Sequence, residues 1–116
     1  MIESPLLPTL GGYINGQWVM ADSGKTLAVT NPVDNGHLAD VASMDAVETE
    51  RAIAAAESAQ ATPADRETRR GCLNAIAASL TNHREEIGRI LCAEHGKPLA
   101  EAQGEADYAA GFFRYA

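Results

Sequence analysis

Two cysteines, Cys72 and Cys92, carry the most nucleophilic chemistry in this chain of 116 residues. A reactive thiol needs a pKa depressed by a helix N-terminus or by a cationic neighbour. Cys72 falls in the middle of one helical pattern, and Cys92 falls in the last turn of another, where the helix dipole disfavours a thiolate. We therefore expect both to be packing cysteines, because free cysteine is among the residue types most often buried.

Histidines and carboxylates suggest metal or acid–base chemistry only weakly. The three histidines are far apart in the sequence and show no spacing typical of a zinc site: His37, His83 and His95. Four carboxylates surround a helix corner, but acid–base catalysis needs a converging partner, and the sequence offers none. The simpler interpretation of these four is a solvated helix face: Glu94, Glu101, Glu105 and Asp107.

Glycine motifs and aromatic residues complete the search for chemistry. Neither G-x-G-x-x-G nor a P-loop occurs, and Gly11-Gly12 precedes a hairpin instead of joining a strand to a helix. The one aromatic cluster, Phe112-Phe113-Arg114-Tyr115, either packs into a neighbouring layer or lines a ligand site. From the residue types alone, the chain contains no complete catalytic constellation.

Charge and hydropathy exclude some classes of partner. The net charge of −7 argues against a nucleic-acid partner, which favours a clustered basic face. No apolar run reaches the ~18 residues that a membrane span needs, so we expect no membrane partner. The first residues, MIESPLLPTL, lack the pattern of a signal peptide, and we expect reduced cysteines and a cytoplasmic location.

The elements that would position these residues begin with strands. Residues 1–12 read as an arm, and residues 13–42 read as a β-meander that opens with a tight hairpin turn at Asn15-Gly16. From residue 45 to residue 116 the hydrophobic period is helical. Asp45 and Glu48 predict a capping box for the first helix, which runs to about Ala61.

Three further helices follow. Thr62 is expected to cap the second, with Pro63 at its first position and a buried stripe of Leu73, Ile76, Ala77 and Leu80. Asn82 and Glu85 predict the start of the third. Gly96 is expected to close the third helix in the left-handed conformation, with Pro98 in the first turn of the fourth.

The fourth helix has an apolar seam and no stop signal before Ala116. The seam comprises Leu99, Ala102, Ala106, Ala109 and Phe113. Much of the 46% hydrophobic content is alanine, which favours helix but buries little area. We therefore expect a thin core and interpret the chain as a shell that clasps a sheet supplied by sequence after Ala116.

Several stretches of residues 13–116 form one familiar series, among them Ile14-Asn15-Gly16-Gln17-Trp18-Val19, Val29-Thr30-Asn31-Pro32, and His95-Gly96-Lys97-Pro98-Leu99-Ala100-Glu101-Ala102. In their order and spacing they resemble the opening of the NAD(P)-dependent aldehyde dehydrogenases. The last stretch, together with Tyr108-Ala109-Ala110 and Phe112-Phe113, is most similar to the succinate-semialdehyde dehydrogenase branch. One departure is the absence of several residues between Gln60 and Thr62, which predicts a tighter corner there.

The resemblance implies a fold, a reaction and a few site residues. It implies an α/β fold in which this chain is the N-terminal part of a cofactor-binding domain, with NAD or NADP bound in the full-length enzyme and not by this segment alone. The family reaction is thiolate attack on an aldehyde, hydride transfer to NAD(P)+ and thioester hydrolysis, and its catalytic residues belong to sequence after Ala116. A structural monovalent cation is implied at Val29, Thr30 and Glu94, and a substrate-tunnel border at Phe112 and Phe113.

The partners implied are the remainder of the dehydrogenase chain and further copies in a homodimer or homotetramer. On this interpretation the 116 residues alone are inactive. The alternative is a non-catalytic helical interaction module whose fourth helix pairs with another helix. A third reading is a truncated or partly ordered longer protein.

Overall fold

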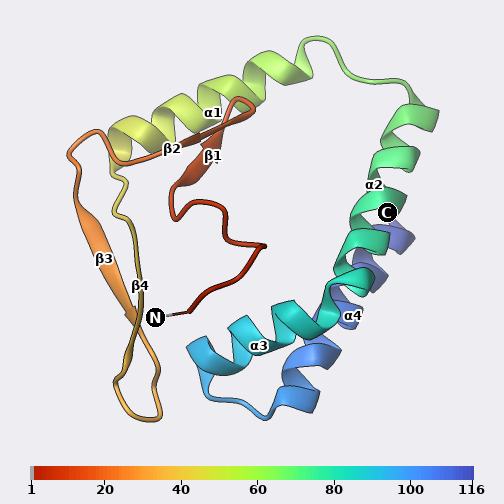
Figure 1. Cartoon of the computed structure of the whole chain (residues 1–116). Helices are drawn as coiled ribbons and strands as arrows, with labels where there is room; N and C mark the ends of the chain where they lie inside the picture. The colour runs from red at the N-terminus through yellow and green to blue at the C-terminus, as the bar shows by residue number, and fades with distance from the viewer. Residues whose placement is uncertain (1) are drawn as a thin grey trace.

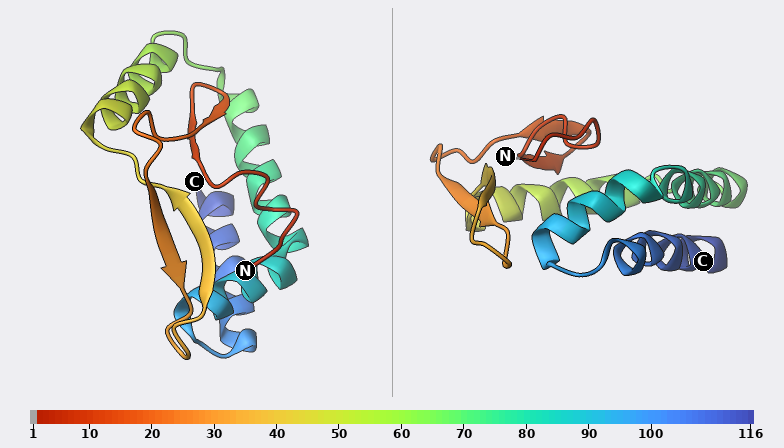
Figure 2. Two further views of the ribbon diagram at one scale, coloured as in Figure 1. Left: turned by 60° about the vertical axis from the view of Figure 1, so that its left-hand side comes forward. Right: turned by 60° about the horizontal axis from the view of Figure 1, so that its bottom comes forward.

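The structure, a computed structural model, describes residues 2–116. Two β-hairpins and a first helix form one part of the molecule, and three further helices form the other (Figure 1). A short connection, residues 61–65, joins the two parts along the chain. In the right-hand view of Figure 2, the first hairpin and the last helix lie on opposite sides of α3 (Arg84–His95). The α/β fold class is confirmed.

The strands pair as two separate hairpins. β1 (Gly12–Ile14) pairs with β2 (Gln17–Val19), and Asn15 and Gly16 turn between them with φ angles of 49° and 78°, as predicted. β3 (Thr26–Thr30) pairs with β4 (His37–Ala42). The predicted continuous meander over residues 13–42 is wrong in this respect, because no ladder joins β2 to β3 within the described residues. A turn with Gly24 at φ 67° separates them.

The first helix, α1 (Ala46–Gln60), is tied to the hairpins by Glu48. The capping box with Asp45 is present, as predicted. Glu48 is also buried at 2% exposure, where its carboxylate accepts from the Asp22 N–H at 2.7 Å and from the Asp45 N–H at 3.1 Å. These hydrogen bonds, chiefly the one from Asp22, lower the pKa of Glu48 to about 2. One carboxylate therefore joins the start of α1 to the segment that follows β2.

The shifted pKa predicts a pH-dependent contribution to stability. Because the folded pKa lies below the ordinary 4.5, the contribution is complete above pH 4.5 and is lost as the pH falls toward about 2. We expect Glu48→Gln to lower the urea midpoint above pH 4.5 and to flatten its decline below that pH. Trp18, the only tryptophan, reports on this unit by fluorescence. Glu50→Gln, an exposed carboxyl on the same helix, is the matched control and is expected to leave the pH profile unchanged.

The N-terminal arm bridges the two parts. The Ile2 N–H donates to the Leu38 carbonyl at 2.8 Å, and the Leu10 carbonyl accepts from the Ala42 N–H at 2.8 Å, so the arm meets β4 at two points. Between these points Leu6 and Leu7 line a groove of about 330 Å³ together with apolar side chains of α3: Ile87, Ile90 and Leu91. The arm is thus hydrogen-bonded to a strand and lies across a groove from a helix.

The remaining helices begin at residues other than those predicted. α2 (Arg66–Asn82) is capped by Asp65, whose carboxylate accepts from the Thr68 N–H at 2.9 Å and from the Thr68 hydroxyl at 2.9 Å, so Thr62 is not the cap. Asn82 ends α2 instead of capping α3. His83 lies at the junction, and its N–H donates to the Ser79 carbonyl at 3.0 Å.

The core is small and built of alanine. Its buried hydrophobic side chains are Ala21, Ala39, Ala77, Ala102, Ala106 and Ala110. On α4 (Leu99–Tyr115) the buried face is therefore shifted from the predicted seam, since Ala110 replaces Ala109 and Leu99 stays 44% exposed. On α2 only Ala77 of the predicted stripe is buried, and Ile76 is exposed.

Close packing of α3 on α4 depends on Gly88. A Cβ added to Gly88 would lie 2.6 Å from Gln103 Cγ and 3.1 Å from the Gln103 backbone nitrogen. Alanines on α4 and this glycine on α3 let the two backbones approach closely. The helical part is therefore held by small residues, whereas twelve large hydrophobic side chains remain exposed among the described residues.

Candidate functional site

The corner between α3 and α4 contains residues 95–102, one of the stretches on which the resemblance rests. Gly96 ends α3 at φ 68°, as predicted, and its N–H donates to the Cys92 carbonyl. Pro98 is the residue just before α4, whereas the sequence predicted it inside the first turn of that helix. Lys97 Nζ lies 2.7 Å from Glu105 Oε1, and this contact lowers the pKa of Glu105. The ion pair links the corner to the second turn of α4.

The β3–β4 turn lies against this corner. A Cβ added to Gly96 would lie 3.2 Å from both Pro32 Cγ and Val33 Cγ2. A groove of about 360 Å³ runs between the two segments and is lined by Asn31, Val33, Arg89, Cys92, Ala93, Gly96 and Leu99. The end of β3 and the end of α3 are thus brought together, although they are far apart in the sequence.

The expected cation ligands come from these two neighbouring ends. Val29 is half-buried near the end of β3, Thr30 is its exposed last residue, and Glu94 is exposed in the last turn of α3. Glu94 borders the groove that Leu6 and Leu7 of the arm also line. Backbone carbonyls with one carboxylate form a set of hard oxygen donors, which suits a monovalent or other hard cation. The assignment of this site stays a prediction.

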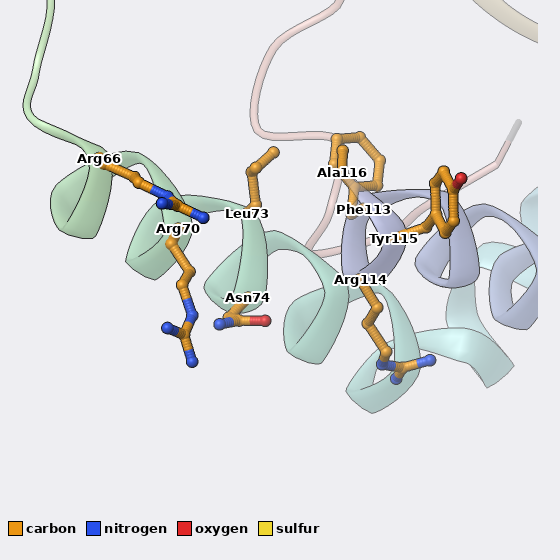
Figure 3. A pocket seen from close by; sticks show the side chains of 8 residues that line it. All are labelled: Arg66, Arg70, Leu73, Asn74, Phe113, Arg114, Tyr115 and Ala116. Carbon is orange, nitrogen blue, oxygen red and sulfur yellow. The ribbon is translucent and has the colours of Figure 1, made fainter.

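The two phenylalanines of α4 do not share one face. Phe112 is 59% exposed and stacks edge to face on Tyr108, with ring centroids 4.8 Å apart. Phe113 is half-buried and borders a crevice of about 370 Å³ between α2 and the end of α4. In Figure 3 Phe113 and Leu73 point to one side of this crevice, and Arg70 and Arg114 point to the other. A tunnel-bordering role for Phe112 and Phe113 stays a prediction.

Cysteines and histidines lie apart from one another. Cys92 is half-buried in the groove beside Gly96, but Cys72 is exposed, so the expectation that both are packing cysteines is wrong for Cys72. The physical reason is that α2 turns Ala77 toward its neighbours and Cys72 toward solvent. His37 pairs with Asp40 at 3.1 Å on β4. Across residues 2–116 no three His, Cys, Asp or Glu side chains gather as a metal-binding group.

Two structural residues escape the sequence patterns. Glu48 is recognisable as a capping residue, but its bond to Asp22 joins positions that are distant in sequence. Gly88 lies inside a helix with no capping role, and a glycine placed there is the signal of a close helix approach.

Among the helices of residues 2–116, none has the length and apolar character needed to cross a bilayer.

Comparison with known proteins gives consistent relatives. Residues 18–116 match the aldehyde dehydrogenase family. The chain is 41% identical to the 3-sulfolactaldehyde dehydrogenase of Pseudomonas putida, over 98% of this chain and 24% of that protein. It is 40% identical to the NADP(+) succinate-semialdehyde dehydrogenase of Escherichia coli, over 88% of this chain and 22% of that protein.

Solved structures agree with these relatives. An oxidoreductase from Marinobacter aquaeolei superposes with a TM-score of 0.94 at 52% identity, covering 99% of this chain and 24% of the other. An aldehyde dehydrogenase from Brucella melitensis superposes with a TM-score of 0.90 at 33% identity, covering 97% and 24%. The chain spans about a quarter of the length of the relatives that it matches. By sequence and by structure, this chain belongs to the aldehyde dehydrogenase family.

Proposed function

We propose that this chain is the N-terminal portion of an NAD(P)-dependent dehydrogenase that oxidises a small acidic aldehyde to the carboxylic acid, with succinate semialdehyde as the leading candidate. The observation that carries the proposal is identity of about 40% to enzymes named for such substrates. These are 3-sulfolactaldehyde, glutarate-semialdehyde and succinate-semialdehyde dehydrogenases. Each of these aldehydes carries a second, acidic group.

The cofactor is assigned to the rest of the enzyme and not to this segment. We propose that residues 2–116 hold no dinucleotide by themselves. In support, their strands form antiparallel hairpins, and the described residues contain no strand, glycine-rich turn and helix in succession. Solved relatives include a betaine aldehyde dehydrogenase of Staphylococcus aureus in complex with NAD+. The preference of this enzyme between NAD and NADP belongs to residues other than these.

The role proposed for residues 2–116 is structural. They position α4, with Phe112 and Phe113 beside the substrate path, and they offer Val29, Thr30 and Glu94 to a structural cation. The proposal includes a homodimeric or homotetrameric, cytoplasmic enzyme with no nucleic-acid or membrane partner. We propose that the 116 residues alone are inactive.

A free-standing helical interaction module is the less favoured candidate. Such a module would pair the apolar seam of α4 with a partner helix. In the structure Ala102 and Ala106 of that seam are already buried, at 0% and 3% exposure, and α4 packs on both α2 and α3. The middle of the seam is thus used within the chain, which favours the dehydrogenase as the better candidate.

A chimaeric enzyme tests the proposal. We would join residues 1–116 to the portion of the Escherichia coli succinate-semialdehyde dehydrogenase that follows the position aligned with Ala116. The expected result is aldehyde-dependent reduction of NADP+ by the chimaera, and none by the 116 residues alone. The matched control is the same downstream polypeptide without any N-terminal portion. An inactive but folded chimaera, or turnover by residues 1–116 alone, would contradict the proposal.

A further inference from the structure

The crevice between α2 and the end of α4 has a lining whose charged side chains are all cationic. They are Arg66, Arg70 and Arg114, and no aspartate or glutamate of the described residues lines it. The chain as a whole carries 16 acidic and 9 basic residues, so a lining of this kind runs against its average composition. We call this feature the arginine crevice.

Two of these arginines lack a close carboxylate partner within residues 2–116. Arg70 lies 3.9 Å from Glu67, whose side chain is 86% exposed, and Arg114 donates to the neutral hydroxyl of Thr81 at 2.8 Å. By contrast, Arg89 on α3 pairs with a carboxylate at 2.9 Å. A guanidinium group carries five N–H donors, so the arginines of the crevice retain donors for an anion.

The arginine crevice also has an apolar border. Leu73 of α2 and Phe113 of α4 are half-buried and line it together with the arginines. In Figure 3 Arg70 and Arg114 point to one side, with Asn74 between them, and the two apolar side chains point to the other. The volume of about 370 Å³ is within the range of small-molecule sites. A fitting ligand therefore combines negative charge with a short hydrocarbon segment.

The placement of the arginines on two helices decides which anion fits best. Guanidinium groups bind carboxylates and phosphates alike, through paired N–H donors. A phosphate ion concentrates its charge on one centre, which Arg66 and Arg70, one turn apart on α2, could hold without α4. A dicarboxylate offers one carboxylate to each helix and leaves its methylene groups for the apolar border. A long nucleic-acid polyanion is disfavoured by the net charge of −7.

We propose that the arginine crevice binds a small dicarboxylate, with one carboxylate on Arg70 of α2 and the other on Arg114 of α4. The inference goes beyond the proposed function and does not rest on it, because it is argued from the lining of the crevice. A ligand that binds only the folded chain stabilises it, so this one would hold α2 and α4 together. Succinate, the simplest saturated dicarboxylate with a methylene chain long enough to separate its charges, is the first probe.

Titration of the whole chain with succinate at pH 7.5, followed by the Nε–Hε resonances of its arginines, tests this proposal. We expect the resonances of Arg70 and Arg114 to shift together and saturably, and that of Arg89 to stay in place. Arg70→Gln should weaken binding by about tenfold, as the loss of hydrogen bonds to a charged group does. Arg89→Gln is the matched control, since it makes the same charge change at a side chain that is 66% exposed, against 70% for Arg70, and lies outside the crevice.

Three further probes separate the chemistry of the ligand. Glutarate should bind as succinate does, whereas acetate, which can occupy only one of the two arginines, should bind about tenfold more weakly at the same ionic strength. Inorganic phosphate should also bind more weakly than succinate. In a chain that ends at Ala116, the terminal carboxylate borders the crevice, so amidation of that end should strengthen the binding of succinate.

Several outcomes would overturn the inference. Phosphate that binds as tightly as succinate would make the crevice a general anion patch. Equal shifts at Arg89 and in the crevice would reduce the effect to non-specific ionic attraction, and no saturable shift in a chain with its native helical signal would remove the site. Arg114→Lys keeps the charge but loses the paired donors, so unweakened binding in this variant and in Arg70→Gln would also exclude the site. Binding is measured directly, so failure here leaves the proposed dehydrogenase function standing, and an inactive chimaera leaves this inference standing.

Discussion

Gly88→Ala is expected to separate α3 from α4 locally and to expose the backbone amides of both helices. The added Cβ would lie 2.6 Å from Gln103 Cγ, which is a flexible side-chain atom, but also 3.1 Å and 3.2 Å from the Gln103 nitrogen and Cα, which are backbone. Overpacking of this kind costs about 1–3 kcal/mol. The higher helix propensity of alanine offsets about 1 kcal/mol of that. The net effect is destabilising.

Amide hydrogen exchange in α3 and α4 measures this effect where it occurs. We expect faster exchange across both helices in Gly88→Ala and unchanged exchange in α1. Gly71→Ala and Gly104→Ala are the matched controls, because a Cβ at either glycine meets nothing within 4 Å. Both controls should slow exchange in their own helices through the gain in propensity of about 1 kcal/mol. Slower exchange in Gly88→Ala itself would show that the two helices do not pack as closely as described.

Local sequence signals were sufficient for the elements and for some of their ends. The capping box of Asp45 and Glu48 and the left-handed residue Gly96 are both predicted and both present. Thr62 is predicted to cap α2, but Asp65 is the cap, because its carboxylate accepts two hydrogen bonds from Thr68. Asn82 is instead the last residue of α2, and the His83 N–H closes the last turn by donating to the Ser79 carbonyl. Competing caps a few residues apart are decided by tertiary geometry that spacing does not encode.

Buried positions were harder to predict than elements. A heptad-like seam on α4 places Ala109 inside, whereas the structure buries Ala110 at 0% exposure. The reason is that α4 packs on two helices at once, so its buried face is wider and rotated relative to a single-partner seam. Gly88 acts by allowing a close approach, which is a property of the pair of helices and not of either sequence alone.

The candidate site came from the resemblance and not from residue spacing. Val29 and Thr30 would act through backbone carbonyls, which every residue possesses, so their side chains give no signal. Phe112 and Phe113 form an obvious aromatic pair in the sequence, yet consecutive residues of a helix point in directions about 100° apart. The structure accordingly places Phe112 in an exposed groove with Tyr108 and Tyr115, and Phe113 in the crevice beside α2.

Gly96→Ala is expected to disturb the corner that joins α3, α4 and the β3–β4 turn. Gly96 has a φ of 68°, and a left-handed residue with a Cβ costs about 1–2 kcal/mol. The added carbon would also press on Pro32 and Val33, each 3.2 Å away. Relief of both strains requires the corner to move away from the turn. The end of β3 and the end of α3, which carry Thr30 and Glu94, would then move apart.

Gly24→Ala separates the two contributions to this effect. Gly24 has nearly the same φ, 67°, but a Cβ there meets nothing within 4 Å, so it reports the backbone cost alone. We expect Gly96→Ala to accelerate amide exchange in the last turn of α3 and the first turn of α4. Gly24→Ala should accelerate exchange only in the turn before β3. Gly96→Asn should be milder than Gly96→Ala at the same site, because asparagine enters the left-handed region more readily than alanine. If Gly96→Ala and Gly24→Ala accelerate local amide exchange to the same extent, the contact between the corner and the β3–β4 turn contributes nothing to stability. The N-terminal arm would then be the segment that links α3 to the end of β3.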